Sequence, residues 1–381
     1  MTYGAYPAGR SVAERVREHF VRHVEAAQRD QDGAVSVIAA PPAVDALETL
    51  IDVAFWTSLR REEGYVPIIS LALLSPDETP SPMRFDEPLV LKPAALTKVA
   101  PAVERPGIHL GVAPIDGTLA VWGATRVLPA YCLVLEVAAP GLLVIKQHRG
   151  GEHTKFANIA VLEADQVKIV DEEASSLPDC PSLLSSLLGF DTPASWTDAV
   201  NVLVQLSVSM RAHKRGGLLL VVPSGTERWR ESIVQPILYE MNPAFAVLAD
   251  LMRQKTADRD RLWQDELGRA IETIAGLTAV DGATIITDRH DLLAFGAKIT
   301  RRRGSPPVEL AAVTEPIEGG APKVGHPSSL GGTRHLSAAQ FVHDQRDAVA
   351  LVASQDGRFT VFAWSPCENM VHAHRVEALL L

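Results

Sequence analysis

Hydrophobic residues near the start of the chain recur at helical spacing. Val12, Val16 and Phe20 lie four residues apart within residues 11–28, and Ser11 stands where an N-cap is expected. This pattern predicts an amphipathic helix. The same criteria predict a second helix at residues 43–59 and short strands at residues 35–39 and 66–74.

Residues 108–167 show a different pattern, in which short apolar runs are separated by turn-forming residues. Such runs are typical of β-strands. The predicted strands are residues 108–112, 119–122, 133–137, 142–146 and 159–162. We therefore expect the first half of the chain to form an α+β domain with a β-rich centre.

The composition changes at residues 171–196, where Asp, Glu, Ser and Pro dominate and the apolar periodicity is lost. One turn of helix, at residues 183–188, is the only regular element that this stretch suggests. We place the domain boundary here. The predicted organisation is an N-terminal sensor or regulatory domain at residues 1–175, a linker at 176–195 and a C-terminal domain at 196–381.

The C-terminal half alternates helical and strand patterns, which is typical of a layered α/β domain. Helices are predicted at residues 196–213, 226–256, 258–277 and 334–345, the second of them polar and interrupted by Pro236 and Pro243. Strands are predicted at residues 217–222, 283–287, 292–299, 348–353 and 359–363, and residues 301–332 read as a Gly/Pro-rich loop. We expect an α/β fold with a mixed β-sheet flanked by helices, in which residues 283–299 form a β-hairpin.

The charge balance limits the classes of partner. The chain has 36 basic and 46 acidic residues, a formal charge of -10, which argues against an extended nucleic-acid-binding surface. No apolar run approaches the roughly 18 residues of a membrane span, and residues 1–11 lack the pattern of a signal peptide. Cysteines without metal or disulfide spacing fit a reducing compartment, and Cys132 and Cys367 are expected to be small core side chains. We expect a cytoplasmic protein with no nucleic-acid or membrane partner.

Three short segments of the second half combine residues that suit a metal-bound nucleoside triphosphate. Residues 281–283 (Asp-Gly-Ala) place a carboxylate beside a small-residue step, before a predicted strand. Residues 332–335 (Gly-Thr-Arg-His) open a predicted helix, where free N–H groups and the helix dipole favour phosphate oxygens, and Arg334 adds a guanidinium fork. Residues 354–357 (Ser-Gln-Asp-Gly) lie between two predicted strands, and the ends of strands are where α/β folds place ligands.

In order and context, these segments resemble the diadenylate cyclase (DAC) domain family. The family pattern is an Asp-Gly-Ala motif leading into a hairpin (here DGATIITDRHDLLAFGAKI), a Gly-Thr-Arg-His-Arg motif opening a helix (here GGTRHLSAAQF) and a strand ending in an acidic turn (here AVALVASQDGRFTVF). The resemblance is dense over residues 281–362 and thinner back to residue 196. It implies a nucleotidyltransferase that joins two ATP molecules into the second messenger cyclic di-AMP and releases two pyrophosphates.

The resemblance also implies roles for individual residues. Asp281 would be a ligand of Mg²⁺ or Mn²⁺ and a catalytic residue that helps deprotonate the attacking ribose hydroxyl, and Asp356 would be a second metal ligand. Arg334 and His335 would be catalytic as well, holding the triphosphate. The implied nucleotide-binding residues are Gly282, Ala283, Gly332, Thr333, Arg334, His335 and Ser354.

Two positions depart from the family pattern. Leu336 stands where the second Arg of the helix motif is expected, and Gln355 with Asp356 replaces an acidic pair. The first removes a positive charge that Lys298 or residues 301–303 could replace, although the arginine run 301–303 reads equally well as a solvated loop tip. The second leaves one carboxylate in the turn.

Several look-alikes have simpler explanations. Residues 32–34 repeat the Asp-Gly-Ala tripeptide without an Arg-His partner and read as a turn. Residues 116–126 imitate the hairpin loosely, and a β-turn with a packed Trp122 is the better interpretation. His148 and His153 are expected to be surface histidines.

The first half contains no recognisable catalytic motif, but residues 92–98, 107–112 and 119–123 resemble the sensor domain named DACNV. The leading hypothesis is therefore a diadenylate cyclase under N-terminal control. It implies a homo-oligomer in which two DAC domains meet face to face, because each chain carries one copy of the triphosphate motifs. One alternative is a degenerate DAC-like module that binds ATP or cyclic di-AMP without turnover, and another is an α/β scaffold.

Overall fold

The computed structural model describes residues 5–30, 38–149, 156–171, 202–255 and 258–381. The chain divides into two compact units, Met1–Val170 together with Leu381, and Asp171–Leu380. Within the described residues there are seven α-helices and two mixed sheets, which confirms the predicted α/β class. None of the described helices has the length and apolarity needed to cross a membrane.

The N-terminal unit is built on one eight-stranded sheet in the order β2-β4-β3-β1-β5-β6-β7-β8. Its strands are β1 (Ile69–Leu73), β2 (Met83–Val90), β3 (His109–Ile115), β4 (Thr118–Thr125), β5 (Leu133–Ala139), β6 (Leu142–His148), β7 (Phe156–Glu163) and β8 (Gln166–Ile169). Its helices are α1 (Gly9–Asp30), α2 (Val44–Ser58) and α3 (Pro93–Val103). Only β1 and β3 pair in parallel, so the sheet is mixed.

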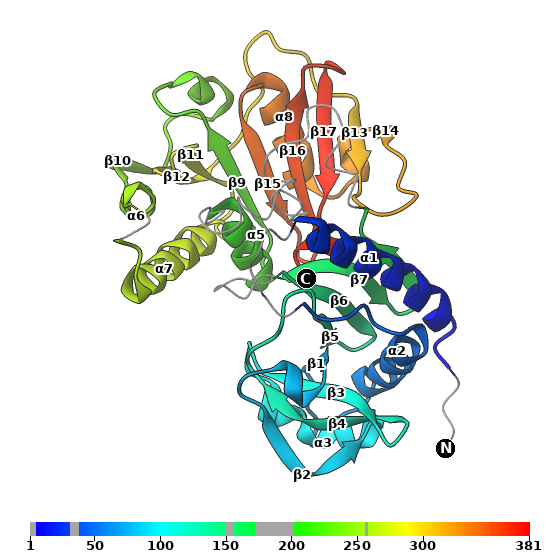
Figure 1. Cartoon of the computed structure of the whole chain (residues 1–381). Helices are drawn as coiled ribbons and strands as arrows, with labels where there is room; N and C mark the ends of the chain where they lie inside the picture. The colour runs from blue at the N-terminus through cyan, green and yellow to red at the C-terminus, as the bar shows by residue number, and fades with distance from the viewer. Residues whose placement is uncertain (1–4, 31–37, 150–155, 172–201, 256–257) are drawn as a thin grey trace. The chain divides into compact units, whose positions relative to one another are not determined.

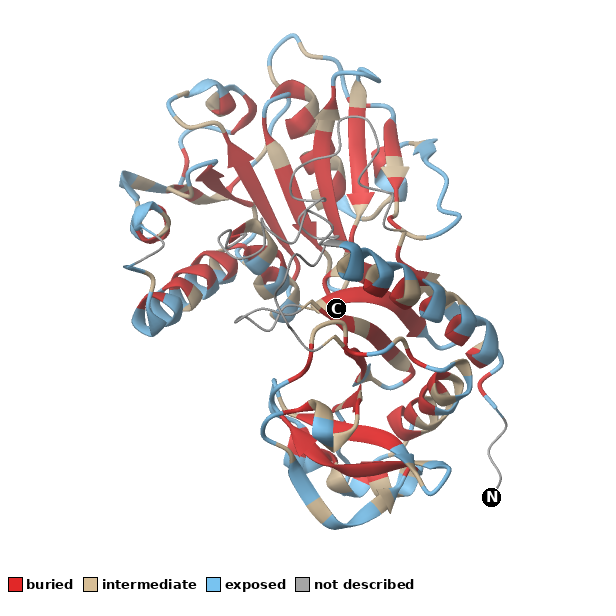
Figure 2. Cartoon of the chain, viewed as in Figure 1, coloured by how far each residue is buried: buried red, intermediate tan, exposed pale blue. Residues whose placement is uncertain are grey.

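One face of this sheet forms the core of the unit with the three helices (Figures 1 and 2). Leu71, Leu110 and Leu135 lie side by side on neighbouring strands and are fully buried. Phe20 of α1 and Leu50 of α2 belong to the same cluster. The predicted helix at residues 11–28 is thus confirmed, because its four-residue repeat is the stripe that contacts the sheet.

The β3–β4 hairpin confirms the β-turn interpretation of residues 116–126. Asp116 and Gly117 have φ values of 50° and 78°, the left-handed pair that a tight hairpin turn requires. Trp122 is 3% exposed and donates its indole N–H to the carbonyl oxygen of Leu74 at 2.8 Å. A Cβ on Gly111 would lie 2.0 Å from the indole ring, so this glycine makes room for the tryptophan.

The C-terminal unit has a nine-stranded sheet in the order β10-β12-β11-β9-β15-β16-β17-β13-β14. Its strands are β9 (Gly217–Val222), β10 (Tyr239–Phe245), β11 (Ala283–Thr287), β12 (Leu292–Ala297), β13 (Ala311–Thr314), β14 (Lys323–Gly325), β15 (Val349–Ala353), β16 (Phe359–Ser365) and β17 (Met370–Arg375). Its helices are α5 (Val202–Ala212), α6 (Val247–Arg253), α7 (Arg261–Leu277) and α8 (Thr333–Asp344). The predicted β-hairpin is the β11–β12 pair.

Strand β9 lies in the middle of this sheet, parallel to β11 and antiparallel to β15. All six of its residues are buried (Figure 2), as its continuous apolar sequence predicts. Helix α8 covers one face through Ala338, Phe341 and Val342, which pack against residues of β9, β15 and β16. The sheet and α8 together form the frame that positions the candidate site.

The prediction of a polar helix at residues 226–256 is wrong. This segment contains a 3₁₀ turn (Arg228–Ser232), then the edge strand β10 and only two turns of helix in α6. Proline disrupts a helix interior but is tolerated on an edge strand, and Pro243 lies within β10. The two prolines therefore lie in a non-helical stretch between the 3₁₀ turn and α6, rather than inside one interrupted helix.

The sequence analysis also missed short strands. The predicted loop at residues 301–332 contains β13 and β14, and β17 follows the last predicted strand. β13 has four residues and pairs in parallel with β17, which lies far along the chain. The pairing of β13 with β17 is thus long-range and is not visible in the local pattern. In the N-terminal unit β2, α3 and β8 were missed as well.

Three single-residue predictions have mixed outcomes. Cys132 is fully buried, as expected, whereas Cys367 is exposed. His148 is not a surface residue, because it is 4% exposed and its Nδ1 lies 2.9 Å from the carbonyl oxygen of Pro129. The predicted linker 176–195, residues 35–37 of the predicted strand at 35–39, residues 32–34 and His153 lie outside the described residues.

Each unit contains a buried histidine that makes stability depend on pH. Burial lowers the pKa of His109 and the pKa of His374 to about 4. Between pH 6.5 and 4 the unfolded chain therefore binds protons that the folded chain does not, so the free energy of unfolding falls as pH falls. We expect a loss of about 2 kcal/mol per histidine between pH 7 and pH 5.

Chemical denaturation at the two pH values measures this loss. The His109→Gln variant should lose less stability on acidification than the parent chain, whereas His326→Gln, at an exposed position, should behave like the parent. Equal pH dependence in His109→Gln and the parent would contradict the assignment.

Candidate functional site

The register of the nine-stranded sheet brings the three predicted motifs to one of its ends. Thr284 pairs with Leu219, so the Asp281–Gly282 step lies level with the start of β9. On the other side of β9, Ala353 pairs with Gly217, which puts the turn at residues 354–357 at the same end. Helix α8 starts at the same end of the sheet, because Arg334 in its first turn lies beside Gly216. The sheet therefore assembles segments that are more than 70 residues apart in sequence.

Asp281 is highly accessible to solvent. Its side chain is 89% exposed, and its Oδ2 lies 2.5 Å from Nζ of Lys298, the residue that follows β12. This hydrogen bond with Lys298, aided by the charge of Arg334, lowers the pKa of the Asp281 carboxyl group. The carboxylate thus stays ionised at neutral pH and open to a ligand.

Gly282 is required by a close backbone contact. Its φ is +120°, and a Cβ at this position would lie 2.5 Å from the carbonyl carbon of Gly296 on β12. Ala283 follows as the first residue of β11 and is fully buried. The small residues of the motif therefore serve the packing of the hairpin that presents Asp281.

Arg334 lies between the hairpin and the turn. A Cβ on Gly216 would be 2.8 Å from Nη1 of Arg334 and 3.3 Å from the carbonyl oxygen of Ala353, which places the guanidinium over the start of β9. Its charge also acts on Asp281, as the lowered pKa of that carboxyl group indicates. The structure thus brings Arg334 and Asp281 together.

His335 occupies a different environment from Arg334. It is 3% exposed, and its ring packs edge-on against Phe362 of β16 at a centroid distance of 6.1 Å. Burial lowers the pKa of His335, and its Nε2 is buried without a hydrogen-bond partner. Gly332 and Thr333, in contrast, are exposed at the start of α8, where no side chain caps the helix.

The turn at residues 354–357 is closed by hydrogen bonds of its own. The N–H of Ser354 donates to the carbonyl oxygen of Arg358 at 2.9 Å, and the carboxylate of Asp356 lies 3.4 Å from Nε of Arg358. Nε2 of Gln355 lies 3.4 Å from the carbonyl oxygen of Arg215. Gln355, which departs from the family pattern, thus contacts the segment that leads into β9.

A cationic pocket of about 280 Å³ adjoins the start of α8. Lys323, Arg358 and Arg375 line it, together with Leu330. Arg358 and Arg375 act electrostatically on His335, so these charges lie beside the helix motif. Arg358 pairs with Asp356 and Arg375 with Glu377, so among the described residues Lys323 is the cation of this pocket best placed to replace the charge that Leu336 removes from the family pattern.

Residues 301–303 are not part of this site. The backbone N–H of Arg302 donates to Oδ2 of Asp344 at the far end of α8, and its side chain pairs with Glu231 at 2.8 Å. The ends of a twelve-residue helix are about 16 Å apart. Leu336, for its part, packs against the core of the unit.

A divalent cation fits Asp281 in the mode in which one carboxylate and the substrate phosphates share the ligation. No group of three His, Cys, Asp or Glu side chains suited to a metal occurs in the described part of the chain. Mg²⁺ is usually held by one or two carboxylates plus phosphate oxygens, so a single exposed carboxylate suffices. Asp356 lies beyond β15, two strands from the Asp281 strand and hence about 10 Å or more away, and is paired with Arg358.

Sequence analysis missed an aromatic surface next to Asp281. The rings of Tyr239 and Phe295 stack at a centroid distance of 4.7 Å and an interplanar angle of 4°. Tyr239 also lies close to Gly296 and is 42% exposed. The signal was present in the aromatic residues, but Tyr239 could not be placed there while its segment was read as helix.

Comparison with known proteins bears on the N-terminal unit. A family model described as "Probable sensor domain DACNV" matches residues 36–126. The match extends from the residues before α2 to the end of β4, and it supports the predicted N-terminal sensor domain. No family model of the catalytic DAC domain was detected in the chain.

The other comparisons add little. No curated protein matched the chain. Among solved structures, a hypothetical membrane spanning protein from Bacillus cereus is 16% identical and has a TM-score of 0.26, with 50% of this chain and 68% of that chain covered. A similarity this low carries no argument about fold or function.

Proposed function

We propose that the chain is a diadenylate cyclase, a nucleotidyltransferase that condenses two ATP molecules into cyclic di-AMP under the control of its N-terminal sensor domain. The observation that carries this proposal is the convergence of Asp281, Arg334 and the 354–357 turn at one end of the sheet. The match of residues 36–126 to a DACNV sensor domain supports it, since the resemblance pairs such domains with cyclases.

In this proposal Asp281 and Lys298 act at the α-phosphate. Because Lys298 lowers the pKa of the Asp281 carboxyl group, Asp281 is a better metal ligand than proton acceptor at neutral pH. Asp281 would hold Mg²⁺ or Mn²⁺, which when bound would neutralise charge as the bond from phosphorus to pyrophosphate breaks. Lys298, 55% exposed, can turn its ammonium group towards the same phosphate.

Arg334 and the cationic pocket would bind the remaining phosphates of ATP. The guanidinium of Arg334 has a fork geometry that suits phosphate oxygens. At the start of α8, the free N–H groups and the positive end of the helix dipole favour the same oxygens. Lys323 and Arg358 extend the positive charge. The buried His335 would support Thr333 and Arg334 from behind rather than reach far into the site.

Two chains must cooperate in this reaction. Each of the two linkages requires the 3′-hydroxyl of one ATP to lie in line with the α-phosphorus of the other, within about 3 to 3.5 Å before attack. One copy of the motifs holds one ATP, so a second chain supplies the partner in a two-fold arrangement.

Incubation of the purified chain with ATP and Mg²⁺ or Mn²⁺ tests the proposal. Mass spectrometry should detect cyclic di-AMP and pyrophosphate, and the specific activity should rise with protein concentration in the dilute range. ATP binding without product in both metals, at every concentration, would reject the cyclase and favour the binding module. Full activity from a species that light scattering shows to be monomeric would reject the face-to-face arrangement.

Arg334→Ala should weaken ATP binding by about tenfold or more, because a charge-assisted contact with phosphate is lost. Isothermal titration calorimetry measures the affinity. Arg261→Ala, at an exposed position on α7, is the control and should bind ATP like the parent. Unchanged affinity in Arg334→Ala would move triphosphate recognition to Lys298 and the cationic pocket.

The binding-module alternative rests on Leu336 and Gln355. Leu336 packs against the core, so the family's second arginine is absent from the site. The same cyclase assay on Leu336→Arg distinguishes the cyclase from the binding module. A rise in turnover would show that the missing charge limits the parent enzyme. No change would show that the pocket already supplies it.

A further inference from the structure

A groove of about 700 Å³ lies at the carboxyl end of α8, at the opposite end of the helix from Arg334. Three arginines line it: Arg228 from the 3₁₀ turn after β9, Arg302 from the segment after β12, and Arg346 just beyond α8. We propose that this groove is a second ligand site, for a small molecule that carries a phosphate group.

The guanidinium groups are arranged to receive an anion. The guanidinium carbon of Arg346 lies over the indole of Trp364, 3.9 Å from the ring centroid. Arg302 is held at Nε by Glu231. Within the described residues, the side chains of Arg228 and Arg346 make no ion pair with a carboxylate.

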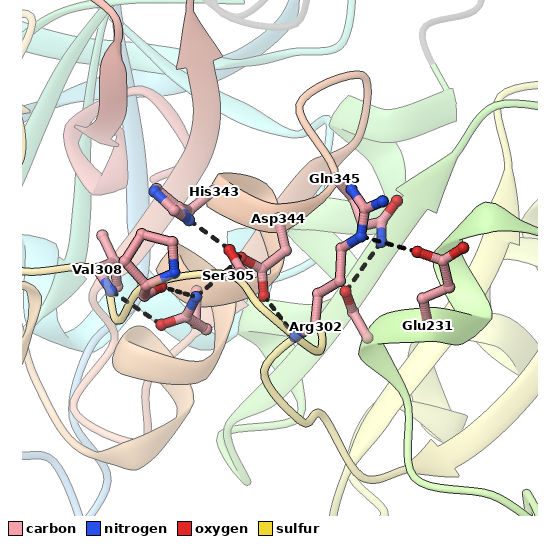
Figure 3. A network of polar contacts seen from close by, with 10 residues as sticks. Glu231, Arg302, Ser305, Val308, His343, Asp344 and Gln345 are labelled. Atoms are coloured by element: carbon pink, nitrogen blue, oxygen red, sulfur yellow. Dashed lines mark hydrogen bonds and ion pairs between the residues drawn. The ribbon is translucent and has the colours of Figure 1, made fainter.

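The buried carboxylate of Asp344, part of the groove lining, is held in a network of polar contacts (Figure 3). Its side chain is 0% exposed and accepts hydrogen bonds from the backbone N–H of Arg302, Oγ of Ser305 and Nε2 of Gln340, at 2.9, 2.5 and 3.0 Å. These bonds satisfy its oxygens and fix the Arg302–Ser305 segment beside the helix end.

His343 and Asp347 complete the charged groups of the lining. Nδ1 of His343 lies 3.0 Å from the Asp344 carboxylate (Figure 3), and the imidazole is part of the lining. Asp347 is the exposed carboxylate of the lining. Because Arg302 is paired with Glu231 and Asp344 is enclosed by its hydrogen bonds, an anion in the groove would bind chiefly to Arg228 and Arg346.

The size and chemistry of the groove select the class of ligand. Sites for small molecules usually measure 300 to 1,000 Å³, roughly the range into which this groove falls. Guanidinium groups match phosphate oxygens in a bidentate manner. Trp364 and Pro306 add apolar surface, which suits a phosphate attached to an organic group such as a nucleoside. The proposal does not depend on the cyclase reaction, because it involves none of its residues.

Calorimetry on an Arg334→Ala chain tests the groove separately from the candidate triphosphate site. Pyrophosphate and AMP are the two probes. At least one of them should bind with one equivalent per chain, and adding Arg346→Gln or Arg228→Gln should weaken that binding at least tenfold. Both arginines are exposed, so neither change should affect folding. Arg269→Gln, on the exposed face of α7, is the matched control and should leave binding unchanged.

Each outcome decides the proposal. Tighter binding of AMP than of pyrophosphate would support a nucleotide that contacts Trp364, and equal binding would support recognition of the phosphate alone. Absence of binding by both probes, or binding that survives both groove substitutions, would overturn the proposal. So would tighter binding of a hexaglutamate peptide than of either phosphate, because the ligand would then be an acidic polypeptide.

Discussion

The Asp281→Asn variant should form cyclic di-AMP at least about a hundredfold more slowly than the parent chain, as expected when an electrostatic contact to a transferring phosphate is lost. The substitution removes the one carboxylate that the sheet presents beside Lys298 and Arg334. Initial rates of cyclic di-AMP formation, followed by mass spectrometry at saturating ATP, measure the effect.

The Asp281→Asn substitution should not change the stability of the fold, so a lower rate would reflect the site itself. The Asp281 side chain is 89% exposed, and an exposed ion pair such as the one with Lys298 contributes little to stability. Asp116→Asn, in the look-alike Asp-Gly turn of the β3–β4 hairpin, is the matched control and should retain full activity. A near-normal rate from Asp281→Asn would remove Asp281 from the mechanism.

The Gly282→Ala variant should lose both activity and stability, with the free energy of unfolding lowered by about 3 kcal/mol. The new Cβ would meet the backbone of Gly296 at 2.5 Å, and alanine rarely adopts a φ of +120°. Relief requires β11 and β12 to move apart, which shifts Asp281 away from Lys298. Urea denaturation and the cyclase assay measure the two losses.

The Gly304→Ala variant separates the effect of a positive φ from the effect of the close contact with Gly296. Gly304 also has a positive φ, of +83°, but a Cβ there would meet nothing within 4 Å. This control should cost about 1 kcal/mol, the backbone component alone, and should leave cyclisation intact. If Gly282→Ala proved no more damaging than Gly304→Ala, the close contact with Gly296 would be unimportant.

The elements predicted from sequence were those whose own residues determine them. β9 is apolar throughout because it is buried on both faces, and α7 repeats its apolar residues on one side, so each is visible locally. β10 and β13 depend on distant strands for their pairing, which no local pattern displays, whereas β17 forms a local hairpin with β16 and was simply missed.

The candidate site was likewise predictable from sequence only in part. Its motifs, from Asp281 to the 354–357 turn, could be found as short segments of sequence. Their meeting at the amino ends of the parallel pair β9 and β11 follows from register, which the sequence does not display. Lys323 and Arg375 reach the site from strands that were not predicted, so no local pattern could have identified them.

The central position of β9 has a consequence for synthesis of the protein on the ribosome. Its two neighbours in the sheet are residues 283–287 and 349–353, so β9 leaves the ribosome long before either strand exists to pair with it. Pairings of such long range form slowly, and the apolar β9 is exposed in the meantime. A nascent chain should therefore be unable to bind ATP at this site until residues 349–375 have been translated, and β9 is the segment for which a chaperone would have most use.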